Sequence, residues 1–517
     1  MSAPAEKLAQ SLEVLSKFQQ AGGKAAIRAK DLSRTHRERL IANGFLHEVI
    51  KGWYIPSRPE ENTGESTPWY ASFWKFCADY LKERFGDAWC LSPEQSLSYL
   101  VGNRIVPRQL MVRSPRARNR ITALPHNTSL FDVRAALPKS DDMELRDGLR
   151  LFSPEAALIA CTPRFYSSHP TDIRAVLLTL RDASNLLRRL LEGGHSTIAG
   201  RLAGAFRNCG RERIADDIVK TMTAAGYEIR ENDPFADKLG LSFSSREASP
   251  YVHRIQLMWQ KMREPAIELF PPAPGRPRAI QAYLKRVKDA YLTDAYHSLS
   301  IEGYQVTPEL IERVRTGAWN PDADPLDREQ RNAMAARGYW QAYQAVLESI
   351  RRVLQGENAG EVADHDHGAW YRELFAPSVA VGILKPADLA GYRNAQVYIR
   401  NSMHVPMNSD AVRDALPILF DLLRNEPESA VRVVLGHFLF VYIHPYMDGN
   451  GRMGRFLMNV MLASGGYPWT VIPVSDRTAY MTALEKASVQ ENIVPFARFL
   501  GGLAEKGLRG EPYPNTP

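Results

Sequence analysis

Twelve consecutive residues, 444 to 455, combine the side chains that acid–base and phosphate chemistry need. The stretch is HPYMDGNGRMGR, with one histidine, one carboxylate, one asparagine, three glycines and two arginines. A histidine can take up a proton near neutral pH. Arginine binds phosphate oxygens through two donors at once. The composition therefore predicts a site where a proton is removed beside a bound polyphosphate.

The spacing within this stretch supports the same chemistry. The glycines allow a sharp turn and let a ligand approach the backbone amides, which attract anions at a helix N-terminus. Arg452 and Arg455 are three residues apart, so both can project from one side of a first helical turn. Asp448 fits beside a phosphate only with a cation between them, and Mg²⁺ is the usual one. A plain glycine-rich turn would leave His444, Asp448 and Asn450 unexplained.

Two apolar runs must position the stretch. Residues 431–443, VRVVLGHFLFVYI, have apolar residues at helical spacing, and residues 456–466, FLMNVMLASGG, end in two glycines. The sequence therefore predicts a tight loop between two buried helices, running into the N-terminus of the second.

The stretch closely resembles the Fic signature, HPF-x-(D/E)-G-N-G-R-x-x-R. It differs only in Tyr446, which stands where phenylalanine is usual and is expected to be a packing element. The resemblance implies an all-helical Fic core with a β-hairpin flap. It also implies AMP transfer from ATP, with Mg²⁺, to a hydroxyl of a target protein.

The resemblance also implies a role for each residue. His444 would deprotonate the target hydroxyl, and Asp448 would hold Mg²⁺. Arg452 would bind the β-phosphate and Arg455 the γ-phosphate. The implied catalytic residues are His444, Asn450, Arg452 and Arg455, and the implied nucleotide contacts are Gly449, Asn450, Gly451, Arg452, Arg455 and, more weakly, Tyr480. A core tyrosine is an equal interpretation of Tyr480.

A second motif, SLSIEG at residues 298–303, resembles the inhibitory helix motif of the same family, (S/T)-x-x-x-E-(G/N). Ser298, Glu302 and Gly303 carry the match. A glutamate aimed at Arg455 would form a charge-assisted pair and would repel the γ-phosphate. The alternative is a helix-end glutamate followed by a glycine C-cap.

A third segment, residues 390–406, alternates Val397 and Ile399 and contains the turn pair Asn401–Ser402. This pattern predicts a hairpin. It resembles the family's flap, where a target segment docks by strand addition.

The N-terminal residues 1–58 predict a winged helix-turn-helix. We expect a helix over 5–22, a short helix to Leu32, a helix capped by Ser33 that ends at Gly44, and strands FLHEVI and GWYIP. The helix after Ser33 carries the candidate DNA contacts Arg34, His36, Arg37 and Arg39. The alternative is a winged module used for protein contacts.

Residues 68–235 predict a small α+β domain. Residues 91–102 and 147–161 indicate a buried helix and a strand leading into a capped helix, and together with the winged helix they resemble the AbiEi-type regulators. Between Arg104 and Arg120 lie six arginines and no acid, which suits either a nucleic-acid patch or a solvated hairpin.

The remaining composition sets bounds. Residues 1–250 carry 36 Lys+Arg and 29 Asp+Glu, a net +7, whereas 251–517 carry 29 of each, so the N-terminal half is the candidate for an acidic partner. We place a domain boundary at the polar 236–250 and the Fic domain over 251–510, with its inhibitory helix near 294–303.

The four cysteines indicate buried free thiols. The cluster Asp364, His365, Asp366 and His367 is interpreted as a solvated helix cap.

The preferred hypothesis is a cytoplasmic, mainly α protein that adds AMP to a Ser, Thr or Tyr hydroxyl of a target protein. We also expect that it can modify its own chain and form a homodimer, and that it does not bind a membrane. Removal of AMP is a second hypothesis. A DNA-binding regulator whose Fic half senses nucleotide is a third. A Doc-type phosphotransferase fits less well, because Gly449 and Arg452 match the transferase pattern.

Overall fold

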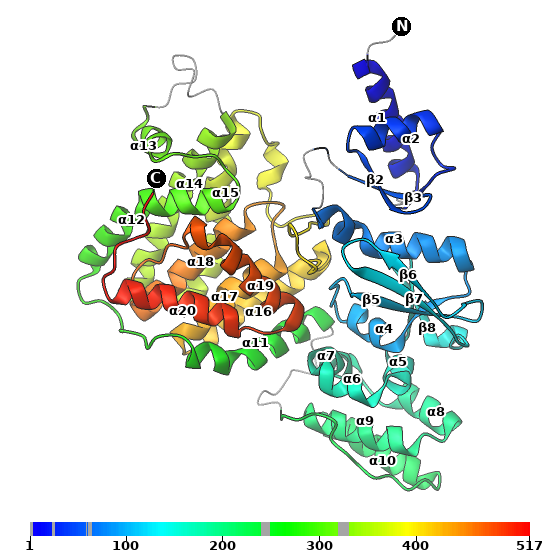
Figure 1. Cartoon of the computed structure of the whole chain (residues 1–517). Helices are drawn as coiled ribbons and strands as arrows, with labels where there is room; N and C mark the ends of the chain where they lie inside the picture. Colours follow the sequence, from blue (N-terminus) through cyan, green and yellow to red (C-terminus); the bar gives the residue numbers. More distant parts are fainter. Residues whose placement is uncertain are drawn as a thin grey trace. The chain divides into compact units, whose positions relative to one another are not determined.

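The structure is a computed structural model that describes residues 4–22, 26–57, 59, 65–238, 249–318 and 330–516 (Figure 1). Helices dominate, and the prediction of a mainly α chain is confirmed. The chain divides into an N-terminal unit, residues 1–250 with 398–405, and a C-terminal unit, residues 251–397 with 406–517. Whether 1–58 and 68–235 are separate domains stays a prediction.

The first elements are small and close on one another. They are α1 (Pro4–Gly22), β1 (Ile27–Arg28), α2 (Arg34–Ala42), β2 (Leu46–Ile50) and β3 (Trp53–Pro56), with the strands in the order β1-β3-β2. The Ser33 hydroxyl accepts from the His36 amide at 3.3 Å, so the predicted N-cap is confirmed. Gly44 follows α2 with φ +75°.

The short helix predicted to end at Leu32 is wrong over the described residues 26–32. Ile27 and Arg28 instead pair with Tyr54 and Trp53 of β3. The Asp31 carboxylate accepts from the Arg28 amide at 2.9 Å, a local bond that competes with helix formation.

The next elements form an α+β part. They are α3 (Thr67–Phe85), β4 (Cys90–Leu91), α4 (Pro93–Leu100), β5 (Gln109–Ser114), β6 (Arg120–Leu124), β7 (Thr128–Arg134), η1 (Ser140–Asp142), β8 (Met143–Arg146) and β9 (Leu149–Phe152). The larger sheet has the order β4-β5-β7-β6, with β5 parallel to β7. The hairpin interpretation of residues 104–120 is wrong, because β7 lies between β5 and β6.

Helices complete this unit. They are α5 (Pro154–Ala160), α6 (Pro163–Ser168), α7 (Pro170–Thr179), α8 (Ser184–Gly193), α9 (Ser196–Asn208) and α10 (Glu212–Ala224). Both predicted elements near 91–102 and 147–161 are confirmed as α4 and as β9 followed by α5. All four cysteines are buried free thiols, as predicted.

Residues 398–405, which lie far along the chain, belong to the N-terminal unit. Arg400 forms an ion pair with Glu65 at 2.7 Å, and the Asn401 amide donates to the Thr67 hydroxyl at 2.9 Å. Val405 packs into the apolar core of this unit. No described residue from 390 to 406 is in a strand, so the predicted hairpin is wrong. Backbone groups of this segment bond instead to residues outside it: the Asn401 amide donates to Thr67, and the Met403 carbonyl accepts from the Val106 amide.

Among its described residues, the C-terminal unit contains helices and no strand. It contains α11 (Pro250–Glu268), α12 (Ile280–Ile301), α13 (Pro308–Thr316), α14 (Gln330–Gln355), α15 (Ala359–Ala380), η3 (Pro386–Leu389), α16 (Ser409–Asn425), α17 (Ser429–Ile443), α18 (Asn450–Gly465), η4 (Val474–Asp476), α19 (Arg477–Gln490) and α20 (Val494–Leu508). One large apolar core links these helices. No helix in the described part of the chain is long and apolar enough to cross a bilayer.

Two of these helices, α17 and α18, form the predicted pair around the 444–449 loop. Almost every side chain of α18 is buried, and α17 is apolar on most of its circumference. A helix that is hydrophobic on all sides must be enclosed by others. The surrounding helices therefore fix the loop at both of its ends.

A close helix contact supports this core and can be tested. A Cβ added at Gly338 of α14 would lie 2.0 Å from the Leu374 carbonyl oxygen of α15. Gly338→Ala should therefore separate the helices, cost about 1–3 kcal/mol and lower the Tm. Gly502→Ala in α20 is the matched control, because nothing lies within 4 Å of its added Cβ. Equal Tm values for the two variants would contradict this packing.

Candidate active site

The loop between α17 and α18 takes its shape from left-handed backbone and one buried amide. His444 ends α17 with φ 55°, and Gly449 begins α18 with φ 78°. The Asn450 side chain accepts from the Tyr446 amide at 2.9 Å and donates to the Tyr446 carbonyl at 2.8 Å. Asn450 therefore fastens the loop with its side chain, and any phosphate contact must come from its backbone.

Gly449 is required by its left-handed backbone, and a Cβ there would also lie 2.8 Å from the Phe375 ring. A Cβ at Gly451, in the first turn of α18, would lie 2.3 Å from Glu302 Oε1, so any larger residue there would have to displace that side chain. The Tyr446 ring stacks on Tyr371 with centroids 3.9 Å apart, so it packs as the sequence predicts.

His444 has one ring nitrogen, Nε2, that can accept a proton. Its Nδ1–H donates to the Val441 carbonyl at 3.0 Å, so in the neutral ring Nε2 keeps the lone pair. Burial lowers the pKa of His444 to about 4, and the Arg393 guanidinium acts in the same direction. The imidazole is therefore neutral at pH 7 and able to accept a proton.

Arg393 is a site residue that the sequence analysis missed. Its Nε donates to the His444 carbonyl at 2.7 Å, and its amide donates to the Pro445 carbonyl at 2.9 Å. Its guanidinium also reaches the Met407 carbonyl, and the residue is 1% exposed. Arg393 thus fixes the backbone on which His444 stands. An isolated arginine in a turn-rich segment gives no sequence signal for this role.

Arg455 and Glu302 form a largely buried ion pair, as the SLSIEG motif led us to expect. Arg455 Nη2 lies 2.7 Å from Glu302 Oε1, and the two side chains are 4% and 26% exposed. Arg455 Nε donates to the Ser298 hydroxyl at 2.8 Å. Burial opposes the charge on Arg455, but Glu302 more than offsets it and raises the arginine's pKa above its usual value.

Glu302 is itself placed by the end of α12. Its amide donates to the Leu299 carbonyl at 3.1 Å, and Gly303 follows with φ +87°. Both interpretations of the motif therefore apply: Glu302 is a helix-end residue before a glycine, and its side chain reaches Arg455.

Arg452 is buried in an aromatic setting. It lies over the rings of Tyr304 and Phe375, at 5.1 and 5.0 Å from their centroids. Within the described residues, Arg452 Nε and Arg455 Nη1 are buried and have no hydrogen-bond partner. Buried donors without partners are costly, and phosphate oxygens would satisfy them.

Asp448 is the exposed acid of the loop. Its Oδ2 lies 3.5 Å from Arg452 Nη2, its side chain is 69% exposed, and its Oδ1 accepts from the Gly449 amide at 2.6 Å. The described residues contain no group of three or more His, Cys, Asp or Glu that could hold a metal. A Mg²⁺ held by one carboxylate and substrate phosphates fits this arrangement.

Tyr480 lies in the core rather than on an open face. It is 1% exposed, and burial raises its pKa to about 12. Its hydroxyl lies 2.7 Å from His437 Nε2, and His437 Nδ1 lies 2.9 Å from the Gly454 carbonyl. This packing matches the core-tyrosine interpretation and leaves the ring no open face for adenine. His437, which the sequence analysis missed, connects Tyr480 to the first turns of α18.

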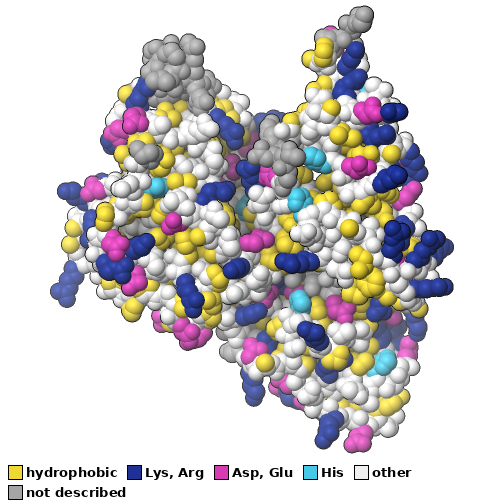
Figure 2. All heavy atoms as spheres, in the orientation of Figure 1, with side chains coloured by type: hydrophobic (Ala, Val, Ile, Leu, Met, Phe, Trp, Pro, Cys, Tyr) yellow, Lys and Arg dark blue, Asp and Glu magenta, His cyan; other side chains and the backbone are white. Residues whose placement is uncertain are grey.

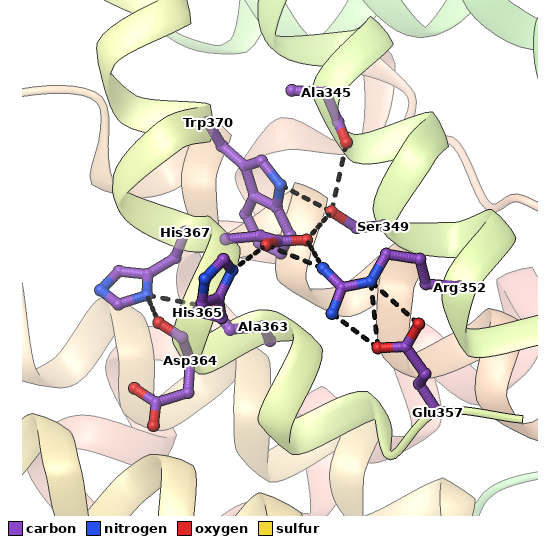
Figure 3. Close-up of polar contacts among 10 residues, drawn as sticks. Ala345, Ser349, Arg352, Glu357, Ala363, Asp364, His365, His367 and Trp370 are labelled. Atoms are coloured by element: carbon purple, nitrogen blue, oxygen red, sulfur yellow. Dashed lines mark hydrogen bonds and ion pairs between the residues drawn. The ribbon is translucent and has the colours of Figure 1, made fainter.

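The acidic and histidine cluster at 364–367 lies inside α15, after the Asn358 N-cap, and is not a helix cap. Asp366 accepts from the Ser349 hydroxyl at 2.7 Å and from Arg352 at 3.1 Å, and Trp370 Nε1 donates to Ser349 at 3.0 Å (Figure 3). These bonds join α14 to α15, so the cluster is structural.

The candidate DNA contacts of α2 are mostly engaged within the N-terminal unit. Arg37 donates to the Ala29 carbonyl and Arg39 to the Lys7 carbonyl, both at 2.7 Å. His36 lies 2.9 Å from the Ser11 hydroxyl. Arg34 is exposed and pairs with Glu38. These contacts use donors of Arg37 and Arg39 within the protein, so fewer of their donors are left for a phosphate.

Comparison with known proteins identifies the loop and its helices. Residues 366–462 match the model of the Fic/DOC family. The matched range includes α17, the loop and most of α18. Glu302 lies outside the matched range.

Two curated relatives are both named protein adenylyltransferase Fic. That of Drosophila willistoni is 29% identical over 234 residues, covering 44% of this chain and 43% of the relative. That of Nematostella vectensis is 29% identical over 271 residues, covering 51% and 58%. The chain thus spans about half the length of the curated relatives it matches.

Solved structures give weaker matches. Fic-1 of C. elegans, residues 134–508, is 17% identical with a TM-score of 0.37, covering 63% of this chain and 91% of that one. A Fic-domain signaling protein of Bacteroides thetaiotaomicron is 18% identical with a TM-score of 0.34, covering 50% and 100%. TM-scores this low do not establish that the aligned parts superpose.

The burial of Asp294 in α12 can be tested, because it makes the stability of the protein depend on pH. This carboxylate is 4% exposed and accepts from the Tyr339 hydroxyl at 2.6 Å. Burial raises its pKa from 3.8 to about 6, although Tyr339 and Arg455 oppose the rise. The folded state therefore binds this proton more tightly than the unfolded state does. Its contribution to stability is present below about pH 4 and is lost as pH rises to about 6.

Asp294→Asn should remove that loss. We expect the difference in Tm, variant minus wild type, to increase when the pH is raised from 4.5 to 7.5. The increase should correspond to about 1–3 kcal/mol. The measurement is thermal unfolding of both proteins at the two pH values. A difference in Tm that does not change with pH would show that Asp294 does not titrate as described.

Proposed function

We propose that the protein transfers AMP from ATP to a Ser, Thr or Tyr hydroxyl of a target protein. The observation that carries this proposal is the pairing of His444, with Nε2 available, and two buried arginines that keep donors without partners. The names of the curated relatives support the same activity.

In this proposal, His444 Nε2 takes the proton of the target hydroxyl as that oxygen attacks the α-phosphorus. The bond to the β-phosphate oxygen breaks, and pyrophosphate leaves. Arg452 and Arg455 offset the negative charge of the phosphates. Arg393 keeps the His444 backbone in place. Mg²⁺, when bound at Asp448 and the phosphates, would supply further charge compensation.

We also propose that Glu302 inhibits this activity. It occupies the Arg455 guanidinium that the γ-phosphate would need, and its own charge repels that phosphate. ATP would then bind poorly or with its α-phosphate out of line. Since in-line transfer depends on exact alignment, small misplacements cost on the order of 10²-fold in rate.

Removal of AMP from a modified protein is the alternative activity at the same residues. Glu302 would then position a water molecule instead of blocking ATP. The two activities predict opposite effects of losing Glu302, so one set of variants separates them. Self-modification and a homodimer remain part of the proposal.

A second proposed function is duplex DNA binding by the N-terminal unit. It rests on the net +7 of residues 1–250 against zero for the remainder of the chain. Such binding would make the chain a regulator as well as an enzyme.

Glu302→Gly should raise AMP transfer on the order of 10²-fold, including transfer to the chain itself. The carboxylate that engages Arg455 is gone, so the arginine can bind the γ-phosphate. The measurement is incorporation of label from α-labelled ATP with Mg²⁺, using purified protein and cell lysate.

Two double variants control this experiment. Adding Arg455→Ala should abolish the gain, because the released arginine is its cause, and adding His444→Ala should abolish transfer while nucleotide still binds. If Glu302→Gly is no more active than wild type, or if it loses an AMP-removing activity that wild type has, Glu302 is not an inhibitor of transfer.

A further inference from the structure

One turn of the N-terminal unit concentrates positive charge. Between Arg104 and Arg134 the sequence contains seven arginines and one acid, Asp132. Asp132 is fully buried, so it contributes no acidic side chain to the surface. Figure 2 shows Lys and Arg side chains on the surface of the N-terminal unit.

The buried Asp132 carboxylate determines how this turn is built. Its Oδ1 accepts from the Arg118 amide at 2.9 Å and from the Arg120 amide at 3.2 Å. Its Oδ2 pairs with Arg84 at the end of α3. The carboxylate therefore uses its oxygens on the backbone of the turn and on Arg84. The Arg118 and Arg120 side chains are left exposed.

A third arginine lies beside the same turn. The Arg134 amide donates to the Asn119 side chain at 2.7 Å, and Asn119 has φ 54°. Arg134 therefore lies next to the residue between Arg118 and Arg120, and its side chain is also exposed. Among the described residues, none of these three guanidinium groups has a carboxylate partner. We call Arg118, Arg120 and Arg134 the basic turn.

The basic turn contrasts with α2, where all four candidate side chains bond to other residues of the unit. The three guanidinium groups of the basic turn are exposed and have no carboxylate partner among the described residues, so their charge is available to an anion. Guanidinium forks match phosphate oxygens, and phosphate contacts supply most of the affinity of proteins for nucleic acid.

We propose that the basic turn binds the phosphate backbone of duplex DNA. This inference rests on the proposal that the N-terminal unit binds DNA and locates that binding at the turn rather than at α2. It does not depend on AMP transfer. Because the contacts are to phosphates, the turn would add affinity without choosing a base sequence.

The test is fluorescence anisotropy of a labelled duplex with the full-length chain, at about 50 to 200 mM salt. The variants are Arg118→Ala/Arg120→Ala/Arg134→Ala and, as a matched control, Arg181→Ala/Arg188→Ala/Arg213→Ala, three exposed arginines elsewhere in the same unit. Both triples remove three positive charges from the chain. A third variant changes the basic turn to lysines and keeps its charge.

We expect the alanine variant of the turn to lose affinity by on the order of 10-fold, and the slope of log Kd against log salt to fall by roughly 2 to 3. The control triple should stay near wild type, and the lysine variant should keep most of the slope. All variants should retain the wild-type Tm, which shows that they fold.

Equal affinity of the two alanine triples would overturn the proposal for the turn while leaving DNA binding by the unit intact. No DNA binding by wild type at low salt would overturn both, without touching AMP transfer. Competition by polyglutamate as strong as by duplex of equal charge would overturn the assignment to nucleic acid.

Discussion

The buried ion pair between Arg455 and Glu302 is the interaction on which the site depends. A guanidinium that is 4% exposed needs an opposite charge nearby, and in this structure Glu302 supplies it. In the proposed function, a nucleotide phosphate would offer the same compensation at the same place. The Glu302 carboxylate and the γ-phosphate would then be alternative partners of Arg455, which would stay paired when one replaces the other.

Other parts of the C-terminal unit hold the loop, His444 and Glu302 in position. The buried helices α17 and α18 fix both ends of the loop, and Asn450 closes it from within. Arg393 fixes the His444 carbonyl from a segment outside the pair. On α12, the buried Asp294 and Ser298 bond to Tyr339 and Arg455 respectively. Glu302 thus approaches Arg455 from a helix that is itself anchored along one face.

Local features were predictable from sequence, and long-range ones were not. The loop, its two helices and the Ser33 cap follow from glycine positions, apolar spacing and short-range bonds. The hairpin expected near Asn401 failed because its backbone bonds to Thr67, more than three hundred residues away. The prediction of a hairpin over residues 104–120 was wrong because β7 lies between β5 and β6 in the sheet. Arg393, Asp294 and His437 act through distant backbone and side chains, and their own sequence neighbourhoods give no sign of this.

In the proposed function, Glu302 denies Arg455 to the γ-phosphate. The most direct test compares the Kd of ATP with that of ADP, by calorimetry with Mg²⁺, in wild type and in Glu302→Gly. ADP lacks the phosphate in question. We expect similar affinities for the two nucleotides in wild type and a preference for ATP on the order of 10-fold in the variant, as for one added charge-assisted contact. The same ATP-to-ADP ratio in both proteins would contradict this expectation.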